Sequence, residues 1–335
     1  MIPGTSVFGT TAKGRQVHRA AISNGSLSAA ILTHGVALQD VRLSGIAQSL
    51  TVGSPDLAAY EGRMASCGSI VGPVGNRIGN ATATIDGVTC HFDKNLNGKH
   101  TLHGGGAATH RRVWDLTDTG PTHATFQVTL EHGEHGFPGN RTLTARYDLP
   151  FDATLRLTLT ATTDAPTLMN LANHSYWRLD DAPTFAGQTL KVAADRYLPA
   201  TVEDVLPTGD IAAVDGTRFD YRQGRTLRAG DEGLLDTNFC LSQARQGLRP
   251  VAWLTGTGGL QLEMSTTEPG LQVFDGHILD LPQYSGNDGA PYAAYAGLAL
   301  EAQFWPDAPN NPRFPPILLR PGDDWQQVTT WRFTH

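Results

Sequence analysis

The stretch Asn170–Leu179 has the sequence Asn-Leu-Ala-Asn-His-Ser-Tyr-Trp-Arg-Leu, and a regular strand pattern leads into it. From Thr154 to Ala161, leucine and alanine alternate with threonine and arginine, which is the period of a β-strand with one buried face. After a break at Asp164–Pro166, His174 stands among amides, a hydroxyl and two aromatic rings. An imidazole titrates near neutral pH and both gives and takes protons. The pattern predicts either a proton-transfer histidine beside a sugar-stacking wall or a histidine hydrogen-bonded within a β core.

The composition favours an all-β protein built from many short strands. The chain has 335 residues, of which 40% are hydrophobic, and this is enough for a substantial core. Glycine (37) and proline (20) are plentiful and charged residues make up 17%, as expected for strands joined by tight turns. All-β chains of this length often form one unit, and the sequence has no linker or internal repeat. We therefore expect a single domain over residues 1–335.

Several classes of partner are disfavoured by charge and patterning. The net charge is −7 and the longest basic run is His110–Arg112, so no nucleic-acid partner is expected. Cys67, Cys90 and Cys240 are too scattered for a disulfide framework or a zinc site. Met1–Ser6 lacks the pattern of a signal peptide, and no apolar run reaches membrane-spanning length. The expectation is a cytoplasmic protein without a membrane partner.

Local patterns predict the elements outside this stretch. Asn24–Gly25 separates two strand patterns, Val17–Ile22 and Leu27–Thr33, and predicts a hairpin turn. A serine followed by proline and aspartate predicts a short helix at Ser54–Tyr60, whereas Pro306–Pro312 predicts a rigid loop that is not helical. Further strands are predicted at Val36–Leu43, Ala124–Leu130, Thr142–Tyr147, Leu260–Met264, Leu271–Phe274 and Trp325–Phe333.

Two glycine-containing loops carry side chains that suit a sugar. Asn76 and Arg77, within Ile70–Ala81, offer an amide and a forked cation that can bind hydroxyls or a ring oxygen, or clamp backbone carbonyls instead. The loop lacks the Gly-Lys-Ser/Thr of a phosphate loop. His103 precedes Gly104–Gly106, where small residues would let a ligand approach the backbone closely.

Histidine pairs elsewhere raise the question of a metal site. His100 and His103 have neither the spacing of a helical pair nor that of a zinc finger. The loop Glu131–Gly139 contains His132 and His135 among carboxylates, and its composition favours a solvated loop over a metal site. No metal is predicted.

Three polar side chains interrupt apolar strand patterns. Asp236 lies within the apolar run Leu234–Phe239, Gln272 points to the opposite side from Val273, and Glu301 closes an apolar strand. A carboxylate in such a place is costly unless it is paired or solvated, so each of these groups is expected to serve hydrogen bonding or a ligand.

The chain also contains a series of short motifs. In order they are Gly75–Ile78, Leu102–Gly105, Gly136–Asn140, Asn173–Tyr176, Tyr197–Pro199, Gly216–Asp220, Gly297–Glu301, Pro306–Asn310 and Arg320–Gly322. Each is weak alone, but together and in this order they resemble the aldose 1-epimerase (galactose mutarotase) family. The resemblance implies a large antiparallel β-sandwich, the galactose mutarotase-like supersandwich, with a monosaccharide in an open cleft and no cofactor.

The resemblance also implies roles for individual residues in mutarotation, the interconversion of α and β anomers through the open-chain aldehyde. Glu301 corresponds to the base at the anomeric hydroxyl, and His174 to the acid at the ring oxygen. The residues implied to bind the sugar are Asn76, Arg77, His103, Tyr176, Asp236 and Gln272.

The sequence departs from the family pattern at a few positions. Gly72–Pro73 stands where many members have Gly-Arg, Thr237 where histidine is common, and Trp177–Arg178 where Phe-Asn is usual. None of these changes removes a proton-transfer group. They leave galactose, glucose and a pentose such as xylose open as substrates, and the oligomeric state open between monomer and homodimer.

Three other functions compete with this one. A hexose-6-phosphate 1-epimerase would need extra cations for the phosphate, for which Arg111, Arg112 and Arg178 are candidates. A non-catalytic carbohydrate-binding β-sandwich would have no need for both Glu301 and His174. A metal-dependent hydrolase is the third alternative.

Overall fold

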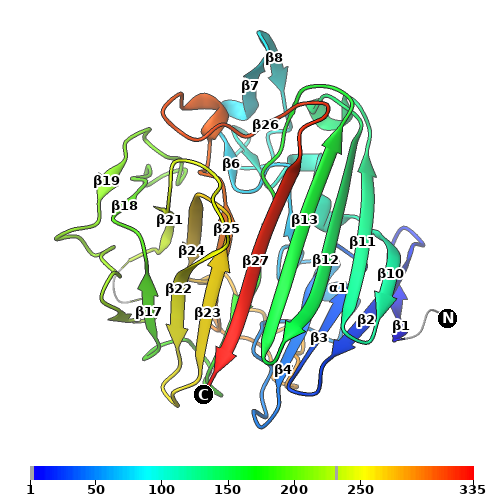
Figure 1. The fold of residues 1–335 in the computed structure, drawn as a ribbon, viewed down its shortest axis with the longest axis vertical. Coiled ribbons are helices and arrows are strands. Elements are labelled where there is room, and N and C mark those ends of the chain that lie inside the picture. Colours follow the sequence, from blue (N-terminus) through cyan, green and yellow to red (C-terminus); the bar gives the residue numbers. More distant parts are fainter. Residues whose placement is uncertain (1–3, 231–232) are drawn as a thin grey trace.

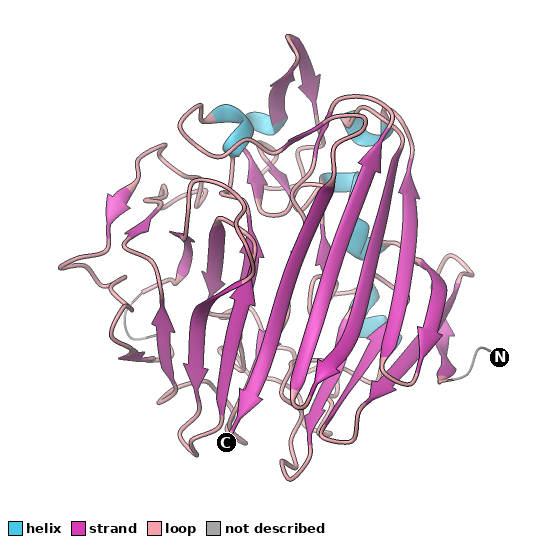
Figure 2. Cartoon of the chain, viewed as in Figure 1, coloured by secondary structure: helices cyan, strands magenta, loops and turns pink. Residues whose placement is uncertain are grey.

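Two layers of antiparallel β-sheet face each other in the computed structural model, which describes residues 4–230 and 233–335 (Figures 1 and 2). One layer is a nine-stranded sheet. In spatial order its strands are β10 (Asp115–Gly120), β11 (His123–Leu130), β12 (Arg141–Phe151), β13 (Thr154–Thr163), β27 (Trp325–Thr334), β23 (Gln261–Thr266), β22 (Arg249–Thr255), β17 (Thr189–Val192) and β20 (Arg225–Thr226). All pairs between named strands in the described chain are antiparallel, which confirms the predicted all-β fold class.

The second layer consists of a six-stranded and a four-stranded sheet. The six strands are β16 (Tyr176–Trp177), β25 (Leu298–Gln303), β24 (Gly270–Phe274), β21 (Asp236–Cys240), β18 (Arg196–Tyr197) and β19 (Ala212–Ala213). The four strands are β1 (Thr5–Thr10), β2 (Gln16–Ser23), β3 (Leu27–Leu32) and β4 (Leu38–Leu43). The predicted hairpin at Asn24–Gly25 joins β2 to β3.

Short elements complete the described chain. The two-stranded ladders pair β14 (Thr167–Leu168) with β26 (Leu318–Leu319), β15 (Ala172–Asn173) with β5 (Ile70–Val71), β6 (Arg77–Ile78) with β9 (Thr101–Leu102), and β7 (Thr82–Ile85) with β8 (Val88–His91). The helical turns are α1 (Leu57–Glu61), η1 (Gly79–Ala81), η2 (Gly105–Ala107), η3 (Thr109–Arg111), η4 (Glu134–Gly136) and η5 (Ala308–Asn310).

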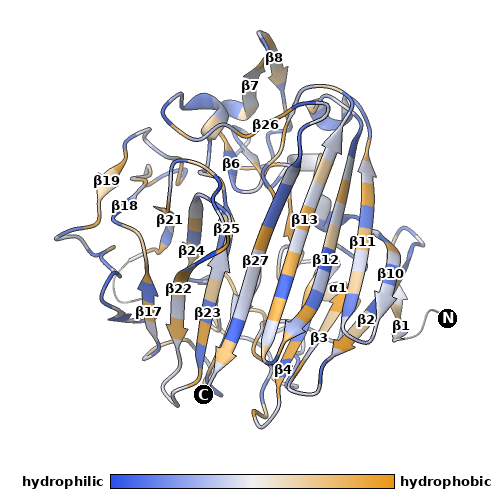
Figure 3. Cartoon of the chain, viewed as in Figure 1, coloured by the Kyte–Doolittle hydropathy of each residue, from blue (hydrophilic) through white to orange (hydrophobic). Residues whose placement is uncertain are grey.

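The main core lies between the two layers. Along β13, Leu155, Leu157 and Leu159 are buried, while Arg156 and Thr158 are more exposed, as the alternation predicts. The same interleaving of apolar and polar residues is visible along neighbouring strands (Figure 3). Each fully buried leucine stabilises the fold by roughly 1.5–3 kcal/mol. A one-residue slip would turn every one of these side chains toward solvent, so the register of the sheet is strongly specified.

The stretch Asn170–Leu179 carries the chain from one layer to the other. After β13 it passes through β15, which pairs with β5, and then enters the six-stranded sheet as β16 beside β25. Asn170 fastens the start of the crossing, because its Oδ1 accepts from the Phe304 N–H at 2.9 Å and its Nδ2 donates to the Phe304 carbonyl at 3.3 Å. The crossing is therefore tied to the segment that follows β25.

Two local predictions need correction. The helix predicted at Ser54–Tyr60 begins later, at Leu57, because Asp56 caps it by accepting from the Ala58 N–H at 2.9 Å. Ser54 stays outside the helix, and its own N–H donates to the Tyr60 hydroxyl. The loop predicted at Pro306–Pro312 contains the 3-10 turn η5, because a proline in a first helical turn lacks only an N–H that would be unpaired there. The signal-peptide prediction concerns Met1–Ser6, of which residues 1–3 lie outside the described residues.

Replacing Asn170 with alanine is expected to destabilise the protein by about 1–3 kcal/mol, because the buried Phe304 backbone groups lose their partners. Urea denaturation of Asn170→Ala, with the exposed Gln326→Ala on β27 as the control, measures this. Equal stability of the two variants would show that the crossing does not depend on this side chain.

Candidate active site

Glu301 lies on a fully buried strand of the six-stranded sheet. Every residue of β25 is buried, and the Glu301 side chain is 2% exposed. In the ladder it is directly opposite Gln272 on β24. Its Oε2 has no hydrogen-bond partner, and burial raises the pKa of the carboxyl well above its usual value, with Asp236 raising it further and Arg77 opposing them. The strand therefore holds a carboxyl group that favours a proton and has one oxygen without a hydrogen-bond partner.

His174 is held by its backbone in the turn between β15 and β16. Its N–H donates to the Ser69 carbonyl, and its carbonyl accepts from the Gly68 N–H, both at 2.9 Å. The neighbouring Asn173 side chain donates to the Gly68 carbonyl at 2.8 Å and to the Tyr147 hydroxyl at 3.0 Å. This anchoring leaves the imidazole free, with no partner at Nδ1.

The two groups face each other across the cleft. His174 Nε2 lies 3.5 Å from Glu301 Oε1, and burial lowers the pKa of His174 to about 4. The raised pKa of Glu301 and the lowered pKa of His174 both favour a neutral pair. Although the atoms are close enough for an ion pair, we therefore assign the pair one proton, located on Glu301 in the free cleft.

His103 is fixed against Asn76 by reciprocal bonds. The His103 N–H donates to the Asn76 carbonyl at 2.8 Å, and the Asn76 N–H donates to His103 Nδ1 at 3.1 Å. Because Nδ1 accepts, the neutral ring carries its proton on Nε2. The ring centroid lies 5.4 Å from that of His174. Burial, with the nearby His174, lowers the pKa of His103 well below its usual value.

The glycines after His103 have a different purpose from the predicted one. Gly104 has φ +83°, and a Cβ there would lie 2.3 Å from the Gly72 carbonyl oxygen. A Cβ at Gly106 would collide with His135 and Asp93. These positions need glycine for close packing against other loops, not for the approach of a ligand.

Arg77 is held between two residues of the proposed site. Its guanidinium donates to Asn76 Oδ1 and to Asp236 Oδ2, both at 3.1 Å. Gln272 donates to the other oxygen of Asp236. The amide, cation and carboxylate therefore form one network beside Glu301, and it leaves Gln272 Oε1 and Arg77 Nε without partners.

These side chains line one cleft of about 350 Å³, a size typical of small-molecule sites. The predicted residues that line it are Asn76, Arg77, His103, His174, Tyr176, Asp236 and Glu301. Gln272 is outside this lining and contacts it through Asp236. Tyr176 is buried beside His174, with ring centroids 5.1 Å apart.

Sequence reasoning missed several residues of the cleft. They are Ser66, Leu102, Val205, Leu234, Phe274, His277 and Ile278. His277 is the polar group with the clearest signal, because it follows Asp275 at the end of β24 and its Nδ1 lies 2.9 Å from Asp275 Oδ1. An Asp-Gly-His turn directly after a strand that carries Gln272 was a readable sign.

The remaining sequence candidates lie elsewhere. His100 contacts Asp204 at 3.0 Å, and the 131–139 loop contains an Arg112–Glu134 pair and a His135–Asp93 pair. No group of three or more His, Cys, Asp or Glu residues suited to a metal occurs within residues 4–230 and 233–335. Over the same residues, no helix is long and apolar enough to span a membrane.

Two of the departures from the family pattern also lie away from the cleft. Trp177 packs in the main core against Trp331, with ring centroids 5.4 Å apart. Arg178 pairs with Asp288 at 2.8 Å. Neither residue lines the cleft.

Comparisons with known proteins agree with the motif order. A family model described as aldose 1-epimerase matches residues 18–332. Galactose mutarotase of Rattus norvegicus is 33% identical over 341 residues, covering 98% of each chain, and aldose 1-epimerase of Escherichia coli (strain K12) is 30% identical over 328 residues, covering 93% of each. A crystal structure of a GalM/aldose epimerase homologue from C. elegans has a TM-score of 0.87 at 30% identity, covering 95% of this chain and 98% of that one. Galactose 1-epimerase from Lactobacillus acidophilus has a TM-score of 0.83 at 25% identity, covering 98% of each chain.

Buried histidines near the cleft predict a loss of stability in acid. His110, whose ring centroid is 6.1 Å from that of His103, has its pKa lowered by burial from 6.5 to about 3. Between these values the unfolded chain binds a proton that the folded chain does not, so the free energy of unfolding falls as pH falls. His110→Phe should reduce the slope of the free energy of unfolding against pH in this range by up to about 1.4 kcal/mol per pH unit. Urea denaturation from pH 7 to pH 4 measures the slope, with the exposed His91→Asn as the control. A slope unchanged in His110→Phe would contradict the assignment.

Proposed function

The chain belongs to the aldose 1-epimerase family, and we propose that it interconverts the anomers of a free aldose with Glu301 as the base and His174 as the acid. The enzyme class is isomerase, as for its relatives. The observation that carries the residue assignment is the 3.5 Å separation of His174 Nε2 and Glu301 Oε1 in one cleft. The anomeric oxygen and the ring oxygen are bonded to the same carbon, so the acid and the base must lie side by side.

The reaction needs two balanced proton transfers. The Glu301 carboxylate accepts the proton of the anomeric hydroxyl while the His174 imidazolium protonates the ring oxygen, and the C1–O5 bond breaks. Rotation about C1–C2 presents the other face of the aldehyde. Glu301 then protonates the carbonyl oxygen while O5 attacks C1. The O5 hydroxyl gives its proton back to His174 in the same step. Each transfer of this kind typically contributes roughly 10²–10⁴-fold to the rate.

Burial of the pair suits the open-chain intermediate. After ring opening, Glu301 is protonated and His174 is neutral, which is the proton distribution that burial favours in the free cleft. Before ring opening, the proton must lie on His174, and sugar hydroxyls together with Arg77 supply partners for the carboxylate. The pair thus keeps one proton throughout the reaction, and ring opening relieves a buried charge separation.

The surrounding network is suited to holding the sugar. We propose that Arg77 and Asn76 bind and polarise hydroxyls, and that His103 donates through Nε2 near the ring oxygen. Asp236 accepts from hydroxyls, and Gln272 supports it by donating to its other oxygen. The unpaired Oε1 of Gln272 offers a further contact. Tyr176 forms the wall beside His174.

A phosphorylated sugar fits this cleft less well than a free one. Among the described lining residues, Arg77 is the only arginine or lysine, and it already pairs with Asp236. Arg111, Arg112 and Arg178 do not line the cleft. A pure binding module would not require a buried, partner-free carboxyl on β25.

We also propose that residues 1–335 form one domain acting in the cytoplasm, as a monomer or homodimer, without nucleic-acid or membrane partners.

Removing either proton-transfer group should abolish most of the turnover. We expect Glu301→Gln and His174→Asn each to lower kcat by at least roughly a hundredfold, because one proton transfer loses its catalyst. Polarimetry of freshly dissolved α-D-galactose measures the rate, and the exposed Glu203→Gln is the matched control. Near-normal rates in either cleft variant would overturn the assignment.

Arg77→Ala is expected to raise KM and lower kcat together, because the guanidinium holds Asn76, Asp236 and the sugar at once. The same polarimetric assay across sugar concentrations separates the two constants. If both constants stay at their normal values, Arg77 is a structural clamp only.

The preferred aldose follows from a ranking of substrates. The relatives are named for galactose, and α-D-galactose, α-D-glucose and α-D-xylose should each relax faster with the enzyme to the same final rotation. Acceleration of glucose 6-phosphate alone would favour a hexose-6-phosphate epimerase. Acceleration of none of these sugars would indicate a binding module.

A further inference from the structure

A second cavity, larger than the catalytic cleft, lies where the four-stranded sheet meets the edge of the nine-stranded sheet. Its volume is about 590 Å³. It is lined by the turn between β1 and β2, by His34, by the end of α1, by the segment from η3 to the start of β10, and by β11. None of its lining residues belongs to the catalytic cleft.

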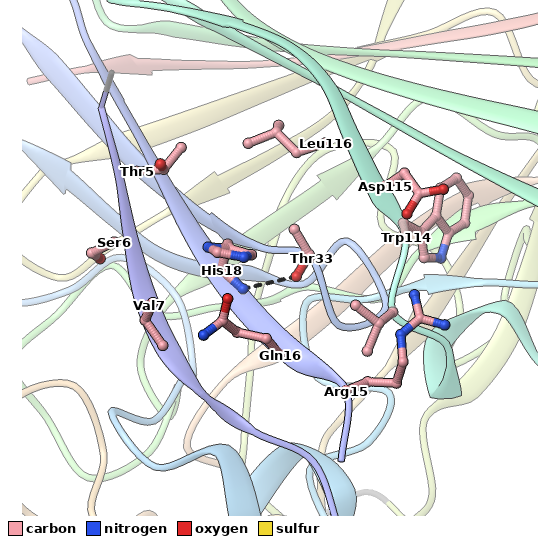
Figure 4. Close-up of a pocket in the computed structure, with 11 residues that line it drawn as sticks. Thr5, Ser6, Val7, Arg15, Gln16, His18, Thr33, Trp114, Asp115 and Leu116 are labelled. Carbon is pink, nitrogen blue, oxygen red and sulfur yellow. Dashed lines mark hydrogen bonds between the residues drawn. The ribbon is translucent and has the colours of Figure 1, made fainter. Parts of the chain in front are cut away.

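Positive side chains gather in this cavity although the chain is acidic overall. Its lining includes Lys13, Arg15, Arg111 and Arg112. For the first three, no ion pair or side-chain hydrogen bond occurs within the described parts of the chain, whereas Arg112 pairs with Glu134. An adjoining pocket of about 380 Å³ shares Arg15, whose side chain extends toward the Trp114–Asp115 segment (Figure 4).

Buried polar atoms at the cavity lack partners. His34 lines it, is 5% exposed, and has no hydrogen bond at Nδ1. Arg112 Nε is likewise buried without a partner. Burial lowers the pKa of His34, while Glu61 opposes this shift and Arg111 adds to it, so both charges act on this ring. Because unpaired buried polar groups cost free energy, these two atoms are a cost that the chain carries at the wall of the cavity.

We propose that this cavity is a second binding site, distinct from the catalytic cleft, for a small phosphate ester held by Arg111 and Arg15 beside His34. Guanidinium groups form paired, charge-assisted hydrogen bonds with phosphate oxygens. Glu61 and Asp115, which also line the cavity, can accept from hydroxyl groups of the ester. The net charge of −7 disfavours a long polyanion, and the volume suits a small molecule.

This site accounts for the arginine pair that the catalytic reaction leaves unused. Arg111 follows His110, whose ring centroid is 6.1 Å from that of His103, a residue of the catalytic cleft. The proposal does not depend on mutarotase activity, because binding is measured directly.

Isothermal titration calorimetry with glucose 6-phosphate and inorganic phosphate tests the site on the full chain. We expect both probes to bind, and Arg111→Ala and Arg15→Ala each to weaken binding by at least tenfold. Arg332→Ala, an exposed arginine on β27, should leave the affinity unchanged, and thermal melts confirm that each variant folds. No binding at millimolar concentration of either probe, or an unchanged affinity in both cavity variants, would overturn the proposal.

A second arm separates this cavity from the catalytic cleft. Glu301→Gln should bind both probes as the wild type does, and excess free galactose should not displace them. Displacement by galactose, or loss of binding in Glu301→Gln, would place the phosphate ester in the catalytic cleft and overturn the proposal.

Discussion

A carboxyl group on a fully buried strand is the constraint on which the rest of the site depends. The Glu301 side chain is almost fully buried and has an oxygen without a hydrogen-bond partner. Such a group either takes a proton or demands compensating donors. The cleft offers both. His174 is close enough to exchange a proton with the Glu301 carboxyl group, and Arg77 favours its charged form. Mutarotation is a reaction that uses both, since it moves one proton to the carboxyl and then back.

The scaffold keeps His174 at a fixed place relative to Glu301. His174 lies two residues before β16, and β16 pairs directly with β25, the strand of Glu301. On the other side of Glu301, β24 supplies Gln272 and β21 supplies Asp236, again by direct pairing. These residues therefore lie on or beside paired strands, whose spacing varies little. Asn76, Arg77 and His103 lie in or next to the short ladder of β6 and β9, and hydrogen bonds hold them together.

How much of this was predictable differs between residues. The alternation around Leu157 was enough to predict its strand, because burial of one face imposes a period of two. Glu301 and His174 stood out as polar groups in apolar or aromatic surroundings, but only the family resemblance paired them, since 127 residues separate them in sequence (301 − 174). The purpose of Gly104 was misjudged because its neighbour, Gly72, is distant in sequence. His277 was missed although the Asp-Gly-His turn after the Gln272 strand marked it, because a turn alone does not show that it lines a cleft.

The order of strands in the nine-stranded sheet has a consequence for biosynthesis. Residues 325–334 form β27, and this strand lies between β13 and β23, near the middle of the sheet. Until it is made, β13 and β23 each present an unpaired backbone edge, and such edges invite pairing with other chains. Before β27 is synthesised, the strands on its two sides, β10 to β13 and β23 to β20, have no strand to connect them. Insertion of β27 pairs it with β13, which is distant in sequence, and such non-local pairing is slow. The unpaired edges of β13 and β23 therefore favour aggregation until β27 has been inserted.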